Sequence, residues 1–228
     1  MKKRNFLIIC VMLLIGVLIF NACNKDDTTK PVITPVITLD TTKPVITLKG
    51  SSTMTIVLNS TFTDPGYTAT DDEDGDITSS VVVTGTVDVN TAGTYKLYYT
   101  VSDAAGNIGT AERTVIVKNE ADYLNGNYNV TDVAAGNTYT YTDNITASST
   151  VNNRVWVTKF AFYTNGAVYF TISGNNVTIP NQTVNCGNPA ADRLFSGTGV
   201  INGNTINITY TETTGGSTIS GTETYVKQ

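Results

Sequence analysis

Residues 94–107, TYKLYYTVSDAAGN, decide the fold class of this chain. Tyr95, Leu97, Tyr99 and Val101 recur at every second position, and the residues between them form the opposite face. Successive side chains of a β-strand point to opposite faces, so this period of two predicts a strand with one buried face. The last five residues, DAAGN, are typical of the turn that ends such a strand.

Similar runs surround this stretch and predict an all-β domain over residues 44–118. Turn residues separate the runs at the intervals of a β-sandwich, and no run has a helical period. Strands are expected at 44–48, 53–58, 66–70, 77–88, 94–102 and 109–117.

Three blocks in fixed order carry a specific resemblance: FTDPGYTATDDEDGDIT, GTVDVNTAGTYKLYYTVSDAAGN and RTVIV. Together they resemble the bacterial immunoglobulin-like (Ig-like) domain first described in a pesticidal crystal protein. The resemblance implies an Ig-like β-sandwich over 44–118. It also implies a spacer or adhesion role on a bacterial surface rather than catalysis.

The N-terminus has the features of an export signal. Lys2, Lys3 and Arg4 precede an unbroken apolar run at 6–20. A membrane-spanning helix needs about 20 apolar residues, so the shorter run favours a signal peptide over 1–22. An uncleaved membrane anchor is the alternative.

The segment FNAC, which ends at Cys23, resembles the lipobox of bacterial lipoproteins, with Phe20 where that family prefers Leu. The resemblance implies that Cys23 becomes a lipid-modified N-terminus. The following NKDD resembles the export signal of surface lipoproteins in Bacteroidota-type bacteria. Outer-membrane lipid is then the first partner, because acyl chains anchor a protein stably. The expected location is the cell outer membrane, exposed at the surface.

Removal of residues 1–22 changes the charge balance. It takes away three of the 14 basic residues and none of the 19 acidic ones, so the net charge falls from −5 to −8. The mature chain has no basic patch to offset this charge, which argues against a nucleic-acid partner.

Residues 23–43 form a lipidated, Thr- and Pro-rich tether. DTTKPVIT occurs at 27–34 and again at 40–47, and its prolines favour an extended spacer. DTT resembles the Asp-Thr-Xaa acceptor for O-glycosylation in the same bacterial group, with Thr28 and Thr41 as the modified residues.

The acidic stretch TATDDEDGDITSS, residues 68–80, raises the question of a cation site. An EF-hand aligned on Gly75 would have Thr70 at its first position and Val81 at its twelfth, where ligands are required. The stretch is therefore not an EF-hand.

A sandwich offers another route, because loops 71–76 and 103–107 are expected at the same end. Their oxygens would suit Ca²⁺, which tolerates irregular geometry. The alternative is a solvated turn, in which Asp103 caps its own loop. The candidate ligands are Asp71, Asp72, Asp74, Asp76, Asp103 and Asn107.

Catalysis is not expected, and no catalytic residue is assigned. The chain has no histidine, so Ser-His-Asp, Cys-His and His-ligated zinc sites are excluded. Cys186 is the one cysteine left after processing, which excludes an intramolecular disulfide. A hydrolase based on paired carboxylates is the remaining alternative. Its candidates appear scattered at turns and strand ends: Asp132, Asp143, Asp192, Glu212 and Glu223.

After a linker at 119–122, residues 123–228 predict an antiparallel meander that forms a small barrel or sandwich. Its turns carry Gly-Asn, Asn-Gly and Gly-Gly, as hairpins require. TISGNNVTIPNQTV and FSGTGVINGNTINITYTET loosely resemble the lipocalin-like domains of Bacteroidota surface lipoproteins. Strands are expected at 126–131, 137–147, 154–163, 166–173, 176–179, 193–201, 204–212 and 217–226.

Aromatic residues in this domain supply the candidate ligand-binding set: Tyr139, Tyr141 and Trp156. In RVWVTKFAFY, period two places Trp156, Phe160 and Phe162 on one face, where a small β-domain needs bulky core residues. Tyr139 and Tyr141 could instead form an exposed stacking surface for sugar or peptide.

These observations favour a non-catalytic surface lipoprotein whose Ig-like spacer presents a β-domain for glycan, protein or small-ligand binding. No cofactor is expected other than calcium. The alternative is an envelope-structural component that packs against outer-membrane partners. A cavity or an aromatic surface in 123–228 would favour the binding role, and a filled barrel with a plain surface would favour the structural one.

Overall fold

The computed structural model describes residues 39–187 and 192–228. These residues form β-strands and two short 3₁₀ helices, η1 (Thr78–Ser80) and η2 (Asp122–Leu124). Within the same residues, no helix is long and apolar enough to span a membrane. The predicted signal peptide, Cys23, Thr28 and most of the tether lie outside the described residues.

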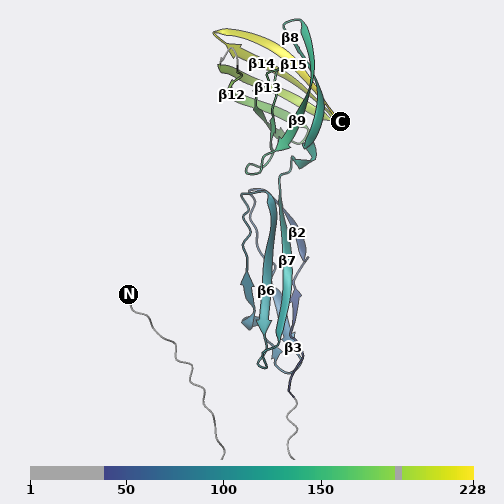
Figure 1. The fold of residues 1–228 in the computed structure, drawn as a ribbon, viewed down its shortest axis with the longest axis vertical. Helices are drawn as coiled ribbons and strands as arrows, with labels where there is room; N and C mark the ends of the chain where they lie inside the picture. The colour runs from purple at the N-terminus through teal and green to yellow at the C-terminus, as the bar shows by residue number, and fades with distance from the viewer. Residues whose placement is uncertain (1–38, 188–191) are drawn as a thin grey trace, which may run out of the picture. The chain divides into compact units, whose positions relative to one another are not determined.

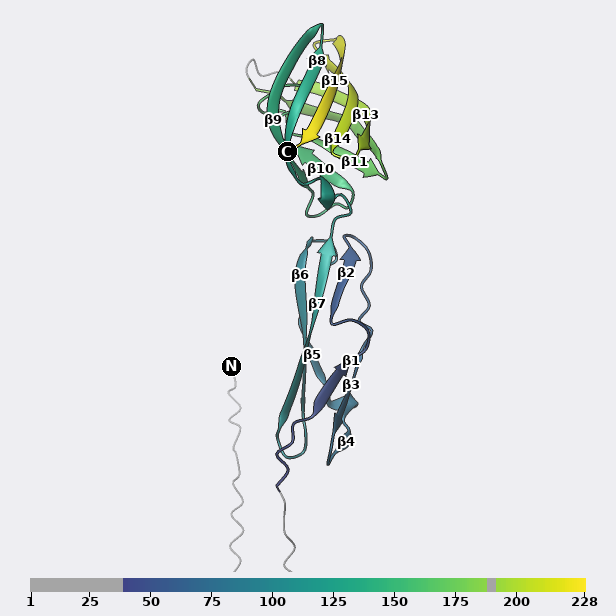
Figure 2. The ribbon, with the colours of Figure 1, turned by 90° about the vertical axis from the view of Figure 1, so that its right-hand side faces the viewer.

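Residues 45–118 form two β-sheets, as the sequence predicts for a sandwich (Figure 2). One sheet has the order β1–β3–β4, with β1 (Val45–Leu48), β3 (Tyr67–Asp71) and β4 (Gly75–Asp76). The other has the order β2–β7–β6–β5, with β2 (Thr53–Val57), β7 (Ile108–Lys118), β6 (Gly93–Ser102) and β5 (Val82–Thr84). β2 pairs with β7 in parallel, and the other pairs are antiparallel.

The alternation in β6 has the predicted phase. Leu97, Tyr99 and Val101 are buried, and the residues between them are exposed. Val115 and Val117 of β7 are buried as well.

The predicted single strand at 77–88 is wrong. This segment forms η1, the short β5 and then extended chain without strand pairing. Thr78 explains the first break, because its N–H donates to Asp76 Oδ1 (2.9 Å) and its hydroxyl accepts from Ala69 N–H (2.9 Å). Such local side-chain bonds compete with ladder pairing. Gly85 follows β5 with φ of +96°, and a Cβ there would lie 2.3 Å from the Lys96 carbonyl oxygen.

Residues 126–227 form a closed antiparallel barrel of eight strands (Figure 1). The strands are β8 (Gly126–Ala134), β9 (Asn137–Ala147), β10 (Arg154–Val157), β11 (Val168–Ser173), β12 (Asn176–Asn185), β13 (Asp192–Asn202), β14 (Thr205–Thr214) and β15 (Ser217–Lys227). Neighbours along the chain pair with one another, and β15 pairs with β8 to close the ring. The predicted meander is confirmed, and of its two forms the barrel is the one present.

Strand β12 continues beyond the predicted end at residue 179 by means of an irregularity. Its register with β13 shifts between Ile179 and Gln182, around Pro180, which has no N–H to donate. On its other side β12 faces β11, where the Gln182 side chain takes the place of a backbone partner for Tyr169. Tyr169 N–H donates to Gln182 Oε1 (3.0 Å), and Gln182 Nε2 donates to the Tyr169 carbonyl oxygen (2.9 Å).

The predicted strand at 154–163 is wrong in two respects: the strand ends earlier, and its residues that face the interior are the ones predicted to face outward. β10 ends at Val157, with Val155 and Val157 buried and Trp156 on the outer face, 39% exposed. Phe160 is core as predicted, whereas Phe162 is 48% exposed. The strand ends because the Asp143 carboxylate accepts from the backbone N–H groups of Thr158 (3.2 Å) and Lys159 (2.9 Å).

Aromatic side chains fill the barrel interior. Phe160 turns inward from the 158–167 connection, and its ring lies 5.0 Å from that of Tyr210, 5.2 Å from Phe195 and 5.8 Å from Phe170. These edge-to-face contacts are favourable beyond the area they bury. Phe160 and its neighbours therefore occupy the barrel axis.

Candidate functional site

A pocket of about 300 Å³ opens at the end of the barrel that carries the β8–β9 and β14–β15 hairpins. We call it the mouth pocket. Its lining includes Asp132 from β8, Tyr139 from β9, Tyr210 and Glu212 from β14, and Phe162 and Tyr163 from the connection between β10 and β11. This volume is at the lower end of the range for small-molecule sites.

Two exposed aromatic rings form one edge of the mouth pocket. Tyr139 and Phe162 stack with ring centroids 4.7 Å apart and planes inclined by 17°. Their exposed fractions are 38% and 48%. Tyr141 meets Phe162 edge-on from the interior side, with centroids 5.7 Å apart. The predicted aromatic surface is therefore made by Tyr139 with Phe162, while Tyr141 lies beneath it.

Phe162 reaches this position through a strained backbone. Ala161 and Phe162 both have positive φ, +52° and +66°. Such conformations cost roughly 1–3 kcal/mol per residue and persist only where the surroundings hold them. Here Ala161 N–H donates to Glu223 Oε1 (2.7 Å), and Phe162 N–H makes a weaker contact with the Tyr141 hydroxyl (3.5 Å).

Two buried carboxylates form the inner wall of the mouth pocket. Asp132 accepts a hydrogen bond from the Tyr210 hydroxyl (2.8 Å), and burial raises the pKa of Asp132. Glu212 accepts from the Tyr163 hydroxyl (3.0 Å) and forms an ion pair with Arg193. Burial, followed by the nearby Glu212 charge, raises the pKa of Tyr163 to about 12.

A third carboxylate, Glu223, lies deeper and is fully buried. It accepts hydrogen bonds from the hydroxyls of Tyr141 and Tyr225 and from Ala161 N–H. Burial raises the pKa of Glu223 to about 8, against the lowering effect of these donors.

This arrangement corrects the expectation that the acidic residues of 123–228 are scattered at turns and strand ends. Asp132, Glu212 and Glu223 lie within β8, β14 and β15 and point inward. The sequence contained the signal, because Glu212 shares the phase of Ile206, Ile208 and Tyr210. Asp143 is also buried, in β9, and Asp192 is exposed at the start of β13.

The acidic side chains of the mouth pocket already have partners within the protein. Its two carboxylates are both engaged by tyrosine hydroxyls, and Glu212 is neutralised by Arg193. What the pocket presents is hydrogen-bond acceptors beside an aromatic surface. Cys186, the free cysteine of the described residues, is buried, and burial raises the pKa of its thiol to about 11, which makes it a poor nucleophile.

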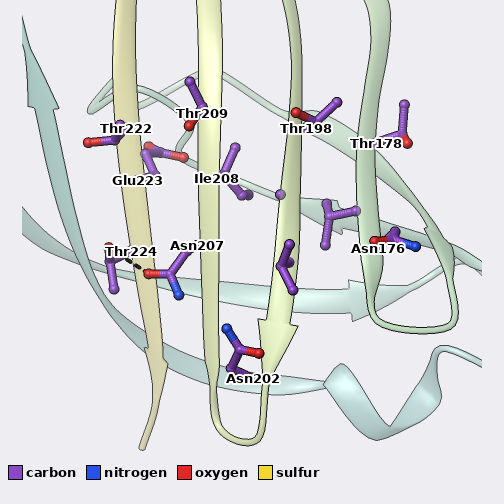
Figure 3. Close-up of a pocket in the computed structure, with 13 residues that line it drawn as sticks. Asn176, Thr178, Thr198, Asn202, Asn207, Ile208, Thr209, Thr222, Glu223 and Thr224 are labelled. Carbon is purple, nitrogen blue, oxygen red and sulfur yellow. Dashed lines mark hydrogen bonds between the residues drawn. The ribbon is translucent and has the colours of Figure 1, made fainter.

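A second concavity, of about 770 Å³, lies on the outer face of β12–β15 (Figure 3). We call it the outer groove. Thr178, Thr198, Thr209 and Thr222 are consecutive cross-strand partners there and form one row. Asn176 and Asn207 also border it, and its lining has no aromatic side chain. Glu223 borders this groove, but its carboxylate is bonded in the interior.

Trp156 belongs to a different surface from Tyr139. It packs against Tyr169 at a centroid distance of 5.3 Å, and the Arg154 guanidinium lies 4.2 Å from the centre of the Tyr169 ring. The structure therefore separates Trp156 from Tyr139 and Tyr141, which both contact Phe162, a residue that the sequence assigned to the core.

In the Ig-like domain, loops 71–76 and 103–107 share one end, as expected. Asp74 Oδ2 accepts from Ala104 N–H at 2.6 Å. Asp76 accepts from Thr78 N–H, and Asp103 accepts from Asn107 N–H (2.7 Å) and Nδ2 (2.9 Å). Asp103 thus caps its own turn, and the Asn107 side-chain amide points its donor at Asp103.

Of the six predicted calcium ligands, Asp71 and Asp72 are brought together with a residue that the sequence did not suggest, Asp40. One carboxylate oxygen of each lies within 4.8 Å of the others. Thr41, the second predicted glycosylation site, is exposed beside this cluster.

Comparisons with known proteins agree with the fold. Residues 46–117 match the family model described as "Bacterial surface protein, Ig-like domain". The resemblance of this segment to bacterial Ig-like domains is therefore confirmed. A comparison with curated proteins gave no match.

Two solved structures illustrate the more distant likenesses. The chain is similar to the lipoprotein BT2262 from Bacteroides thetaiotaomicron at 20% identity and a TM-score of 0.36, over 81% of this chain and 100% of that one. It is also similar to a structure of CBM51-2 in complex with GlcNAc and INT domains from Clostridium perfringens ZmpB. There the identity is 16% and the TM-score 0.29, over 81% of this chain and 44% of that one.

Proposed function

We propose that this protein is a non-catalytic, lipid-anchored surface protein that binds a sugar unit of a glycan in the mouth pocket of its barrel. The Ig-like domain serves as a spacer in this proposal. The observation that carries it is the pairing of an exposed aromatic edge, Tyr139 and Phe162, with the buried carboxylates Asp132 and Glu212 in one pocket.

Sugar rings present an apolar C–H face and a rim of hydroxyl donors. The stacked rings of Tyr139 and Phe162 match the apolar face, and aromatic surfaces of this kind contribute a large share of binding energy. Carboxylate oxygens accept hydrogen bonds from hydroxyls, and charge-assisted bonds are about twice as strong as neutral ones. The outer groove offers hydroxyls and amides without a ring for stacking, so it is the weaker candidate.

Binding is tested with residues 24–228, produced without the lipid, on a glycan array and then by calorimetry with the best sugar. Phe162→Ala and Tyr139→Ala should each weaken binding by about tenfold or more, because each removes an apolar surface worth at least about 1.4 kcal/mol. The barrel should keep its fold, since both rings are partly exposed.

Trp156→Ala is the matched control, because it removes a similarly exposed aromatic ring from the outer face of β10. It should leave binding unchanged. Loss of binding in this variant, or in Thr209→Val of the outer groove, would show that the sugar binds outside the mouth pocket. A protein that binds no glycan at all would support the envelope-structural alternative instead.

The lipid anchor is tested separately. Cys23→Ala should shift the protein from the membrane fraction to the soluble fraction and abolish labelling with a fatty-acid probe, because no other residue carries the anchor in this proposal.

Protease added to intact cells should degrade the wild-type protein, and full protection would place it on the periplasmic side. Mass spectrometry of the tether tests glycans on Thr28 and Thr41.

A further inference from the structure

We propose a calcium site in the Ig-like domain, formed by Asp40, Asp71 and Asp72, which fastens the segment before β1 to the turn between β3 and β4. Three observations lead to it: the convergence of three carboxylates, the absence of cations paired with them, and one buried oxygen without a partner.

The three carboxylates come from two separate parts of the chain. Asp71 ends β3 and Asp72 follows it, while Asp40 lies five residues before β1. One oxygen of each lies within 4.8 Å of the other two. Like charges at this distance repel each other, so the arrangement favours a cation among them.

No protein cation offsets these charges within residues 39–187 and 192–228. The ion pairs there join Lys96 to Glu112, Arg113 to Asp64 and Arg193 to Glu212. Among the described residues, the Asp40 and Asp72 carboxylates accept hydrogen bonds from Thr42, whose N–H donates to Asp40 Oδ1 (2.8 Å) and whose hydroxyl donates to Asp72 Oδ2 (3.3 Å). These bonds orient the two side chains, but they come from a neutral residue and do not neutralise the carboxylate charges.

Asp71 supplies the observation that points to a ligand. Its side chain is more than nine-tenths buried, with 9% exposed. Oδ1 accepts from Glu73 N–H and Asp74 N–H, both at 3.1 Å. Oδ2 is buried and, among the described residues, has no hydrogen-bond partner. An unpaired buried carboxylate oxygen is costly, and a bound cation beside Asp40 and Asp72 would satisfy it.

Calcium fits this donor set better than magnesium. Ca²⁺ takes six to eight oxygen ligands in irregular geometry, so three carboxylates completed by water suit it. Mg²⁺ requires near-ideal octahedral geometry and is seldom held by protein ligands alone. Four predicted ligands are not part of the site: Asp74, Asp76 and Asp103 accept from backbone N–H groups outside it, and the Asn107 side-chain amide donates to Asp103.

The test uses residues 24–228 with CaCl₂ as the probe. Calorimetry should show saturable binding, and at 100-fold excess over the dissociation constant the melting temperature of the Ig-like domain should rise by several degrees or more. EDTA should reverse the shift. Hydrogen exchange of the amides at 40–43 should slow on calcium addition, because the ion would tie this segment to β3.

Asp71→Asn and Asp40→Asn should each lower calcium affinity by at least about tenfold. Both keep an oxygen that can accept the existing N–H bonds, so neither should unfold the domain. Asp88→Asn is the matched control, since it makes the same substitution in the same domain at a carboxylate that accepts from Asn90 N–H. The proposal is overturned if the wild type shows no calcium-dependent shift, or if Asp88→Asn lowers affinity as much as Asp71→Asn. It is overturned equally if Asp76→Asn abolishes binding while Asp71→Asn does not.

Discussion

Arg113→Met is expected to lower the free energy of unfolding of the Ig-like domain by about 3–5 kcal/mol. Arg113 is fully buried between the two sheets. Its Nε lies 3.2 Å from the Tyr99 hydroxyl and 3.3 Å from Asp64 Oδ1, and its Nη2 donates to the carbonyl oxygens of Lys49 (2.8 Å) and Gly66 (3.2 Å). Removal of the guanidinium would leave Asp64 without its cation and the Lys49 carbonyl without this donor, while Asp64 would still accept from the Tyr99 hydroxyl (2.7 Å) and Gly66 N–H (2.9 Å).

Differential scanning calorimetry of residues 24–228, with hydrogen exchange of the β6 and β7 amides, measures this loss. Lys96→Met is the control, because it removes the same charge from the exposed Lys96–Glu112 pair (2.8 Å) and should cost at most about 1 kcal/mol. Tyr99→Phe deletes one hydroxyl of the network and should cost about 1 kcal/mol if Arg113→Met proves too unstable to measure. Equal costs for Arg113→Met and Lys96→Met would show that the buried network is not what holds the sheets together.

Arg113 also illustrates what the sequence can and cannot predict. In RTVIV it shares the inward phase of Val115 and Val117, so the pattern that identifies the strand places a charge in the core. Its partners come from the Lys49–Ser51 turn and from Asp64 and Gly66, which no spacing rule brings together. Period two predicts which residues face inward, but not which polar groups they will meet.

The strand predictions fail where side-chain hydrogen bonds replace the ladder. The hydrogen bond between Thr78 N–H and Asp76 ends the pairing after β4. The Asp143 carboxylate accepts hydrogen bonds from the backbone N–H groups of Thr158 and Lys159, so β10 ends early. These bonds join residues whose proximity depends on the finished fold. The alternating sequence pattern predicted a strand through residue 163 and therefore placed Phe162 in the core.

Both candidate sites depend on such non-local contacts. Phe162 reaches the mouth pocket because Ala161 N–H is held by Glu223, some sixty residues later in the chain. Asp40 joins Asp71 although it lies before the predicted domain boundary at residue 44. The residue types were visible in the sequence, and the geometry that gives them a common site was not.

Glu223→Gln is expected to remove most of the pH dependence of barrel stability between about pH 4.5 and 8. Burial raises the pKa of Glu223 from its ordinary value of 4.5 to about 8 in the folded barrel. Over that interval the folded state keeps a proton that the unfolded state has lost. The stability contributed by Glu223 is therefore fully present below pH 4.5 and is lost as the pH rises to about 8. A shift of this size corresponds to roughly 5 kcal/mol.

The neutral form has a physical basis in the barrel interior. The Tyr141 hydroxyl lies 3.1 Å from the Lys159 carbonyl oxygen, so it can donate there while accepting from a protonated Glu223. The Gln side chain has the same shape and stays neutral at every pH. The variant should match the wild type near pH 5 and exceed it in stability by several kcal/mol near pH 8.5.

Urea unfolding followed by fluorescence isolates this effect, because Trp156 is the only tryptophan of the chain and lies in the barrel. Asp192→Asn is the control, since it makes a similar change at an exposed carboxylate at the start of β13 and should leave the pH profile unchanged. If Glu223→Gln keeps the wild-type slope, Glu223 is ionised in the folded barrel, and its three donors outweigh its burial. A wild type that gains stability relative to Glu223→Gln as the pH rises to about 5 would reverse the sign of the effect, since this gain requires a folded-state pKa below 4.5.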